Sequence, residues 1–511
     1  MHITLVIYIV TANEELFGTM QIFGRNMVAG LKEIVLFPFD DHAFPLQNGV
    51  QLSLKGYQGG VGRTQIVLAP GEPGGPDSVH VAYYGTVKKV GDEFWMWYLG
   101  QGPVKDEDAD QPWFQRVCLA KSTDGYNWER PDLGLIEYNG DTHNNLVDLG
   151  SDIGHISACV VFHEPEDPDP ERRFKMAFAD RRYRNHLAVA FSADGLTWLE
   201  SDRNPVGPWF EMSGGIRIDD AWYLAGQGGK HLKDAARQFA THMSYDFENW
   251  TLASSLGFQR SGSSKQKTSG KNDGKQVHLG AGLWNRDNVI IGLYGMWNGH
   301  PSNDRRMVNM DLGLIVSHDA LHYREPVADF PIVSAAEDNW KPLPHGPDLH
   351  KFPALMQGQG FENIGEETLF WYSPWPEQKS DGIRVASWPR DRLGCFNAYI
   401  HGPLTNQTAD PSHIVSAPVD LQGQSARLEL NIDLPNQHCG VSIAILNERL
   451  EPLEGYDSQD NQEIGSGFNV PVRWTGRDLI ENIKGPIRIR INFTGVRFED
   501  VSLFAAYLRV V

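Results

Sequence analysis

Short runs of alternating apolar and polar residues follow one another along most of the chain, and helical periodicity is nearly absent. Runs such as VCLAKS, LAVAFS and LGLIVS have the two-residue period of a strand with one face buried. The 52 glycines and 30 prolines punctuate these runs at turns. The pattern predicts an all-β protein.

A heptapeptide with serine first, aspartate third and an aromatic residue last follows several of these runs. The copies are STDGYNW (122–128), SADGLTW (192–198), SYDFENW (244–250) and SHDALHY (317–323), with a degenerate fifth copy, SWPRDRLG, that begins at Ser387. Their first residues are 70, 52, 73 and 70 positions apart. Aspartate bonds its own backbone and glycine accepts positive φ, so each copy predicts a turn. Repetition at a long period indicates a repeat architecture.

Each interval between the turns contains a strand that breaks at a turn and returns as an aromatic-rich strand. These hairpins are expected at 82–100, 155–180, 209–228, 277–295 and 358–373. Each hairpin, followed by a third strand and the heptapeptide turn, makes one antiparallel four-stranded blade. Five such units predict a five-bladed β-propeller, because radial repetition leaves only short sheet edges.

The pattern changes after about residue 402, where a polar segment is followed by the short alternating strands ARLELNI, GVSIAIL, IRIRINF and SLFAAYL. Alternation of this kind is typical of a sandwich with one wet face. We therefore predict an N-terminal extension at 1–35, the propeller at 36–402 and a C-terminal β-sandwich at 403–511.

Net charge, cysteine spacing and the amino-terminal residues bear on possible partners, on disulfide or zinc content and on location. The net charge of −20 argues against nucleic acid and against an anionic membrane surface, which both require a basic face. The four cysteines are scattered singly, which favours free thiols over a zinc ribbon or a disulfide framework. The apolar run near the amino terminus has no Lys or Arg before it, so it is a poor secretory signal and a cytoplasmic location is favoured over secretion.

The starts of the five expected inner strands carry polar residues in comparable positions. Ligands of propellers bind where these strands converge, and equivalent positions point the same way. We therefore expect one ring of side chains at the mouth of a funnel, formed by His80, His155, Glu211, His278 and Gln357.

The repeated turns together with a C-terminal sandwich resemble glycoside hydrolase family 32. The members of that family are fructosidases, which are related to the family 43 arabinosidases and xylosidases. The phrases WERPDLGLIEYNGDTHNNLV, LGLIVSHDALHYREP and SWPRDRLG resemble an uncharacterised group within that family, and the likeness extends over nearly the whole chain beyond residue 35. The resemblance implies a carbohydrate substrate and hydrolysis. The family has acids on its first three inner strands. Here HVAYYGTV and GHISACVV lack the first two, and only WFEMSGG keeps its acid, Glu211.

Three interpretations of the ring remain open. In a glycosidase, Glu211 donates a proton while a second carboxylate acts across the sugar ring, and the candidates for that second role are Asp77, Glu362 and Asp180. In a metal-dependent sugar hydrolase or lyase, a divalent ion binds His80, His155 and His278; otherwise no cofactor is expected. In the third, the polar groups bind ordered water and keep the blades in register. The alternative function from another class is a non-catalytic carbohydrate-binding protein that has lost the hydrolase acids.

Three further residues are candidates for contacts with a sugar. Trp284 and Trp297 can form a platform for the ring, and Arg305 can hold hydroxyl groups. Tryptophan in this fold is also ordinary core.

Overall fold

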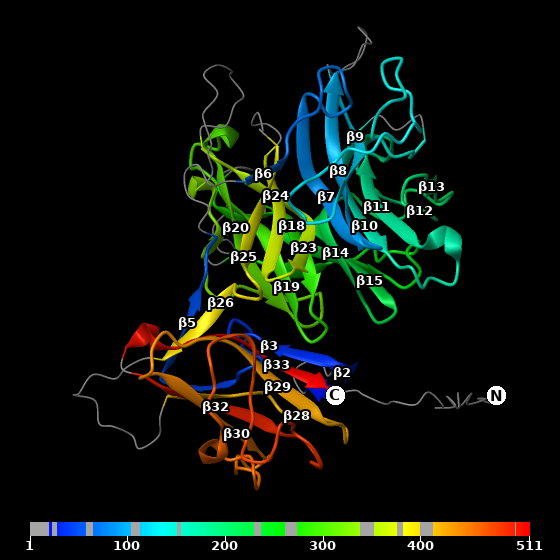
Figure 1. Cartoon of the computed structure of the whole chain (residues 1–511). Helices are drawn as coiled ribbons and strands as arrows, with labels where there is room; N and C mark the ends of the chain where they lie inside the picture. The colour runs from blue at the N-terminus through cyan, green and yellow to red at the C-terminus, as the bar shows by residue number, and fades with distance from the viewer. Residues whose placement is uncertain are drawn as a thin grey trace, which may run out of the picture. The chain divides into compact units, whose positions relative to one another are not determined.

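The computed structural model describes residues 20–22, 28–57, 65–103, 113–150, 155–228, 237–260, 273–337, 352–375, 382–398, 412–495 and 497–511. Within these ranges the regular structure consists of β-strands and short 3-10 turns, so the prediction of an all-β protein is confirmed (Figure 1). No helix in the same ranges is long and apolar enough to cross a membrane. The apolar run near the amino terminus lies outside them.

Five antiparallel units form the predicted propeller blades; the first and fifth belong to one seven-stranded sheet, and the first has three strands where four were predicted. From the innermost strand outwards, the first blade contains β7 (His80–Val90), β8 (Glu93–Pro103) and β9 (Trp113–Ser122), and the second contains β10 (Ile156–His163), β11 (Phe174–Asp180), β12 (Leu187–Ser192) and β13 (Leu199–Glu200). The third contains β14 (Phe210–Ile218), β15 (Ala221–Gly228), β16 (Phe239–Ser244) and β17 (Ser255–Phe258), and the fourth contains β18 (Lys275–Asn285), β19 (Ile290–Asn298), β20 (Asn309–Ser317) and β21 (Tyr323–Arg324). The fifth contains β23 (Leu355–Ile364), β24 (Glu367–Pro374), β25 (Ile383–Pro389) and β6 (Gln65–Leu68).

The innermost strands form a closed ring. Strand β7 contacts β10, and the contacts continue through β14, β18 and β23 back to β7. The last junction includes a parallel pair, Gln359 with Thr86. The sequence analysis did not predict that β6, which precedes the first blade, pairs with β25 as the outer strand of the fifth. Pairing between segments about 300 residues apart leaves no local pattern in the sequence.

The heptapeptide turns occupy equivalent places, at the ends of the third strands β9, β12, β16 and β20, as predicted. In the first copy the Ser122 hydroxyl accepts the Gly125 N–H at 2.9 Å, and the Asp124 carboxylate accepts the Tyr126 and Asn127 N–H groups at 2.9 and 2.8 Å. Burial alone would raise the pKa of Asp124, but these bonds outweigh it and hold the pKa at about 2. Serine and aspartate therefore determine the turn.

The fourth residue of the first two turns also joins neighbouring blades. The Gly125 carbonyl accepts the indole N–H of Trp128 in its own blade and that of Trp371 in the fifth blade, both at 2.9 Å. In the same way the Gly195 carbonyl accepts Trp198 at 3.1 Å and Trp97 of the first blade at 2.9 Å. The repeated aromatic positions thus hold successive blades together.

The degenerate fifth copy joins two blades by charge. Asp391, which is buried, forms an ion pair with Arg286 from the hairpin turn of the fourth blade. Its backbone N–H donates to the Thr368 hydroxyl at 2.8 Å, and its carboxylate accepts the Asn363 amide at 3.0 Å. The turn lacks the serine–aspartate bonds of the other copies but keeps a link between blades.

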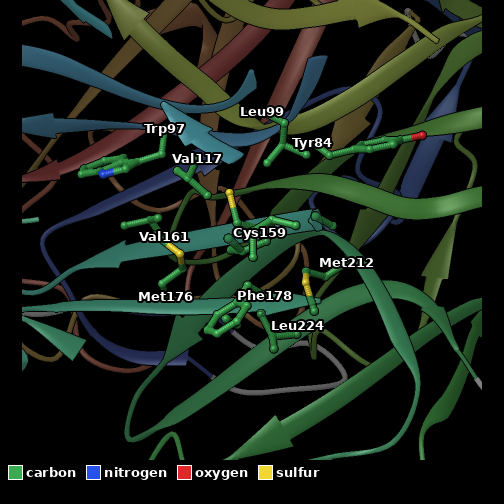
Figure 2. Close-up of a cluster of buried hydrophobic side chains, with 14 of the residues drawn as sticks. Tyr84, Trp97, Leu99, Val117, Cys159, Val161, Met176, Phe178, Met212 and Leu224 are labelled. Atoms are coloured by element: carbon green, nitrogen blue, oxygen red, sulfur yellow. The ribbon is translucent and has the colours of Figure 1, made fainter. Parts of the chain in front are cut away.

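Apolar side chains fill the space between the blades. Figure 2 shows part of the largest cluster, in which Trp97, Val117, Cys159, Met176 and Leu224 come from the first three blades. All four cysteines are free thiols and three of them are buried, which agrees with the prediction. Blade packing therefore depends on branched and aromatic side chains rather than on covalent links.

A second compact unit comprises the described parts of 1–37, 42–51 and 397–511, separate from the propeller unit of 38–41 and 52–396. One of its sheets contains β31 (Gly467–Pro471), β29 (Ala426–Asp433), β33 (Ser502–Val510) and β3 (Glu33–Leu36). The other contains β30 (Gly440–Leu446), β32 (Arg488–Thr494), β27 (His413–Val415) and β4 (Leu46–Asn48). These sheets form the predicted sandwich.

Two amino-terminal strands belong to this sandwich unit. Strand β3 pairs with β33, and β4 pairs with β27. The sequence analysis placed residues 1–35 in an extension and residues 36–402 in the propeller, so it assigned both strands elsewhere. Each partner lies more than 360 residues away along the chain, a separation at which residue alternation cannot identify which strands pair.

Candidate active site

The five residues predicted to form a ring lie at or near the beginnings of the five innermost strands. His80 begins β7, and His155 directly precedes β10. Glu211 is the second residue of β14, His278 the fourth of β18 and Gln357 the third of β23. All five therefore occur at one end of the propeller axis.

Glu211 has the environment expected of a proton donor. Its side chain is half-buried, and no hydrogen bond or ion pair joins its carboxyl to another described residue. Burial raises the pKa of Glu211 above its ordinary value, whereas the positive charges of Arg237 and Arg305 oppose that rise. A carboxyl of this kind retains its proton to higher pH than an exposed one.

The two arginines beside Glu211 rest on aromatic rings. The guanidinium carbon of Arg237 lies 3.9 Å from the ring centre of Trp297, and that of Arg305 lies 4.4 Å from the ring centre of Trp375. Stacking of this kind fixes the plane of a guanidinium group while leaving its edges able to donate hydrogen bonds. Two oriented guanidinium groups thus lie close enough for their charges to act on the Glu211 carboxyl without an ion pair.

His278 connects these aromatic rings. Its ring centre lies 5.4 Å from that of Trp297 and 4.9 Å from that of Trp375, and its Nδ1 is 3.1 Å from the Tyr84 hydroxyl. Trp297 is fully buried between its neighbours. The structure therefore brings together Glu211, His278, Trp297 and Arg305, but Trp297 serves as support for Arg237 and cannot present a free face to a sugar.

His80 and His155 lie on the neighbouring first two blades. Burial lowers the pKa of each to about 4, with the charge of Arg181 contributing at His155. Both imidazoles are therefore neutral near pH 7. Among the described residues, no three His, Cys, Asp or Glu side chains are grouped closely enough to hold a metal ion. The proposed metal site at His80, His155 and His278 is thus not supported by their positions.

Gln357 and Gln359 close the axis below this cluster. The Gln357 amide donates to the backbone carbonyls of His278 and Gly280 at 2.7 and 2.9 Å. The Gln359 side chain accepts the N–H groups of Gly215 and Leu283 at 3.0 and 2.9 Å, which joins the fifth blade to the third and fourth. Gln357 therefore acts as a bridge between blades rather than as a free ligand at the mouth.

Close contact between the inner strands explains their glycines. A Cβ atom on Gly214 would lie 2.0 Å from the Ala281 carbonyl oxygen, and one on Gly282 would lie 2.0 Å from the Gly358 carbonyl oxygen. Real Cβ atoms do not approach backbone so closely, so a side chain at either position would force the inner strands apart. The glycines thus allow Gln359 to span the axis.

Two aspartates that were candidates for a second carboxylate have structural partners. Asp77 is buried in the first blade, where its carboxylate accepts the Tyr98 hydroxyl at 2.5 Å and pairs with Arg130 at 2.7 Å. Asp180 is fully buried and caps a 3-10 turn by accepting the Arg182 N–H at 2.7 Å. Neither aspartate is among the charges that act on Glu211.

Glu362 and Trp284 lie at the opposite end of the innermost strands from Glu211. Glu362 is five residues beyond Gln357 on β23, which corresponds to about 16 Å along a strand. Trp284 stacks on Phe361, with ring centres 5.1 Å apart, and carries Arg286 over its ring at 4.6 Å. The structure therefore separates both from Glu211, because a strand's two ends face opposite openings of the propeller.

The sequence analysis missed Arg237, Trp375 and Tyr84. Arg237 lies before β16 and Trp375 follows β24, so neither belongs to the innermost strands on which the search concentrated. Tyr84 lies on β7, but four residues after His80. An arginine close to an isolated carboxylate would have indicated a functional site. The sequence could not show this proximity, because it arises only when the blades assemble.

No protein-family model matches the chain, and no curated protein matches it in sequence. Solved structures do match in three dimensions. One is from the GH130 family of mannoside phosphorylases, which contains glycoside hydrolases that target β-1,2 mannosidic linkages in Candida mannan (13% identity, TM-score 0.40, covering 66% of this chain and 95% of that one). Another is a glycosyl hydrolase from Bacteroides ovatus (14% identity, TM-score 0.42, covering 66% and 95%).

A third match extends over more of this chain. It is a variant fructofuranosidase from Schwanniomyces occidentalis complexed with fructosylnystose, with 13% identity and a TM-score of 0.38, covering 91% of this chain and 99% of that one. These are likenesses of fold at low identity. They transfer no residue roles to this chain.

Proposed function

We propose that the protein is a carbohydrate-active enzyme that cleaves a glycosidic bond, with Glu211 as the proton donor. The observation that carries this proposal is the Glu211 carboxyl itself, which burial keeps protonated to higher pH and which bonds no other described residue. Glu211 also begins the third inner strand, where the glycosidases that the sequence resembles keep their acid. Proton donation to a leaving oxygen is worth about 10²–10⁴-fold in rate.

Neither of two candidate carboxylates can serve as the partner that a two-carboxylate glycosidase mechanism requires opposite Glu211. Neither Asp77 nor Glu362 is available for the second role, since Asp77 is occupied by Tyr98 and Arg130 and Glu362 is on the far side of Gln359. The charges that act on Glu211 are those of Arg237 and Arg305. In this proposal the arginines hold the substrate, water attacks the anomeric carbon while Glu211 protonates the departing oxygen, and the proton that the attacking water releases returns to Glu211.

The paired arginines favour a second candidate reaction, transfer of the glycosyl group to inorganic phosphate. Guanidinium groups bind phosphate through paired N–H donors, and two of them beside an acid can hold phosphate near the anomeric carbon. A phosphate oxygen would then form the new bond as the glycosidic C–O bond breaks, with the Glu211 proton going to the leaving oxygen. The proton released from hydrogen phosphate would restore Glu211.

Glu211→Gln tests the proton donor, because it preserves shape and removes the proton. On a glycoside with a poor leaving group we expect the rate to fall by about 10²–10⁴-fold, with unchanged circular dichroism. A nitrophenyl glycoside, whose leaving group needs no protonation, should be affected much less. Equal small losses on both substrates would mean that Glu211 only binds, and absence of turnover by the unaltered protein across a glycoside panel would favour a carbohydrate-binding protein.

The acceptor is identified by product analysis with and without phosphate. Hydrolysis predicts free sugar at a rate that phosphate does not change. Phosphorolysis predicts a sugar phosphate whose formation requires inorganic phosphate and is lost in Arg237→Gln and Arg305→Gln. Neither result decides the role of Glu211, which is tested by comparing the poor-leaving-group glycoside with the nitrophenyl glycoside.

A further inference from the structure

A cavity lies at the end of the propeller axis opposite Glu211. Its volume is about 890 Å³, and each of the five innermost strands contributes to its wall. Residues from successive blades are Lys88, Phe162, Arg217, Trp284 and Glu362. Gln359 also lines the cavity and bonds both Gly215 and Leu283, so it forms the floor between this cavity and the Glu211 cluster.

Three of the charged groups of the cavity wall, Glu164, Asp167 and Arg217, have partners within the protein. The Glu164 carboxylate accepts the Lys175 ammonium at 2.6 Å and the Trp222 indole N–H at 2.7 Å. Asp167 also pairs with Lys175, at 2.5 Å, and Lys175 is fully buried beneath them. Arg217 lies 3.4 Å from Glu164. These groups form a network that holds the β10–β11 hairpin of the second blade and links it to Arg217 and Trp222 of the third.

Lys88 and Glu362 differ from these paired groups, because neither has a charged partner in the described part of the chain. Both line the cavity and are half-buried, yet neither forms an ion pair or a side-chain hydrogen bond with any described residue. Burial lowers the pKa of Lys88 and raises that of Glu362, and the attraction of each for the other opposes the shift. The two residues lie on the neighbouring strands β7 and β23, and their charges act on one another without an ion pair; Glu164 also acts on Lys88 and Lys89 on Glu362. Leaving a partly buried charge without a partner costs free energy that a bound ligand can recover.

We propose that this cavity is a second binding site, which takes a neutral carbohydrate whose hydroxyl groups accept from Lys88 and donate to Glu362. A sugar hydroxyl both donates and accepts, so adjacent hydroxyls on one ring satisfy an ammonium and a carboxylate together. The volume is within the range of about 300–1,000 Å³ that is usual for small-molecule sites. The wall has four carboxylates and two cationic side chains, which disfavours an anion.

Aromatic side chains also line the cavity. Trp284 and Phe361 are stacked, and Trp222 and Phe162 line the other side. Rings fixed in this way lose little conformational entropy when a ligand binds. The site is independent of the proposed reaction at Glu211, because Gln359 separates the two and no residue is shared.

The test uses the full-length chain carrying Glu211→Gln, so that turnover does not consume the probe. Sucrose, maltose, cellobiose, xylobiose and raffinose are each titrated and followed by saturation-transfer NMR and calorimetry. We expect at least one to bind, and Lys88→Met and Glu362→Gln each to weaken binding about tenfold or more, since a hydrogen bond to a charged group is worth about 1.5–3 kcal/mol. Glu366→Gln changes an exposed neighbour of the same type as Glu362 and should leave affinity unaltered.

A second measurement avoids dependence on how the variants fold. Reductive methylation of the lysines, followed by mass spectrometry, should show that the bound sugar protects Lys88 and not Lys89. The proposal is overturned if none of the five sugars binds, if binding is indifferent to both substitutions while Lys88 is not protected, or if only amino acids compete for the site. The last result would identify a zwitterion as the ligand in place of a carbohydrate.

Discussion

The indole N–H of Trp97 on β8 donates to the carbonyl oxygen of Gly195, in the turn of the next blade, at 2.9 Å. Trp97 is fully buried, and its ring also packs against Phe174 of the second blade at 6.0 Å between ring centres. A side chain of the first blade thus completes a turn of the second. The repeated turn is a joint between blades as well as a local structure.

Trp97→Phe removes this joint and leaves a cavity. We expect a loss of about 2–4 kcal/mol in the free energy of unfolding, because one hydrogen bond and part of a buried ring disappear together. Urea unfolding followed by circular dichroism measures it. Trp95→Phe is the matched control, since its indole bonds Glu93 of its own blade at 3.3 Å. Equal losses in the two variants would contradict a special role for the Gly195 contact.

Asp391→Asn tests the charged link between the fourth and fifth blades. The substitution leaves the Arg286 guanidinium without its buried carboxylate, so we expect a loss of about 3–5 kcal/mol. Asp132→Asn, which breaks an exposed pair with His143, should change stability by less than about 0.5 kcal/mol. A loss at Asp391 no larger than at Asp132 would show that the buried pair contributes little to blade packing.

Arg305→Gln should raise the pKa of Glu211. The Arg305 charge opposes the effect of burial, so its removal leaves the carboxyl protonated to still higher pH. Carboxyl ¹³C NMR reports the titration directly, with Glu211→Gln identifying the signal. Arg306→Gln is the control, because Arg306 is bound to Asp304 at 2.7 Å. A Glu211 titration that moves to lower pH, or moves equally in the control, would contradict the proposed influence of Arg305.

His80 should make the protein less stable in acid. Its pKa is about 4 in the folded state against 6.5 in the unfolded chain, so the unfolded state takes up a proton first as the pH falls. The stability lost between pH 6.5 and pH 4 is at most about 3 kcal/mol, because one pKa unit corresponds to about 1.4 kcal/mol. His80→Gln should show a correspondingly smaller loss over this window in urea titrations. Parallel curves for the two proteins would mean that His80 is not buried neutral.

The sequence by itself determined the blades. Each heptapeptide turn is held by bonds within its own few residues, as in Ser192 with Gly195 at 2.9 Å and Asp194 with Leu196 at 2.8 Å. Strand alternation likewise depends only on which face each residue presents. Interactions of such short range leave a pattern that can be recognised along the chain, and so the five hairpins and the position of Glu211 at a strand's beginning were predictable.

Only the tertiary structure decided what closes the ring and what surrounds the acid. Strand β6 completes the fifth blade and β3 joins the sandwich across hundreds of residues, and pairing at that distance leaves no local trace. Arg237, whose charge acts on Glu211, lies outside the innermost strands. Glu362 was expected beside Glu211, but the number of residues along a strand decides which opening a side chain faces. Glu211 and the cavity that Glu362 lines are therefore separated by their positions along the propeller axis, which the residue types alone do not reveal.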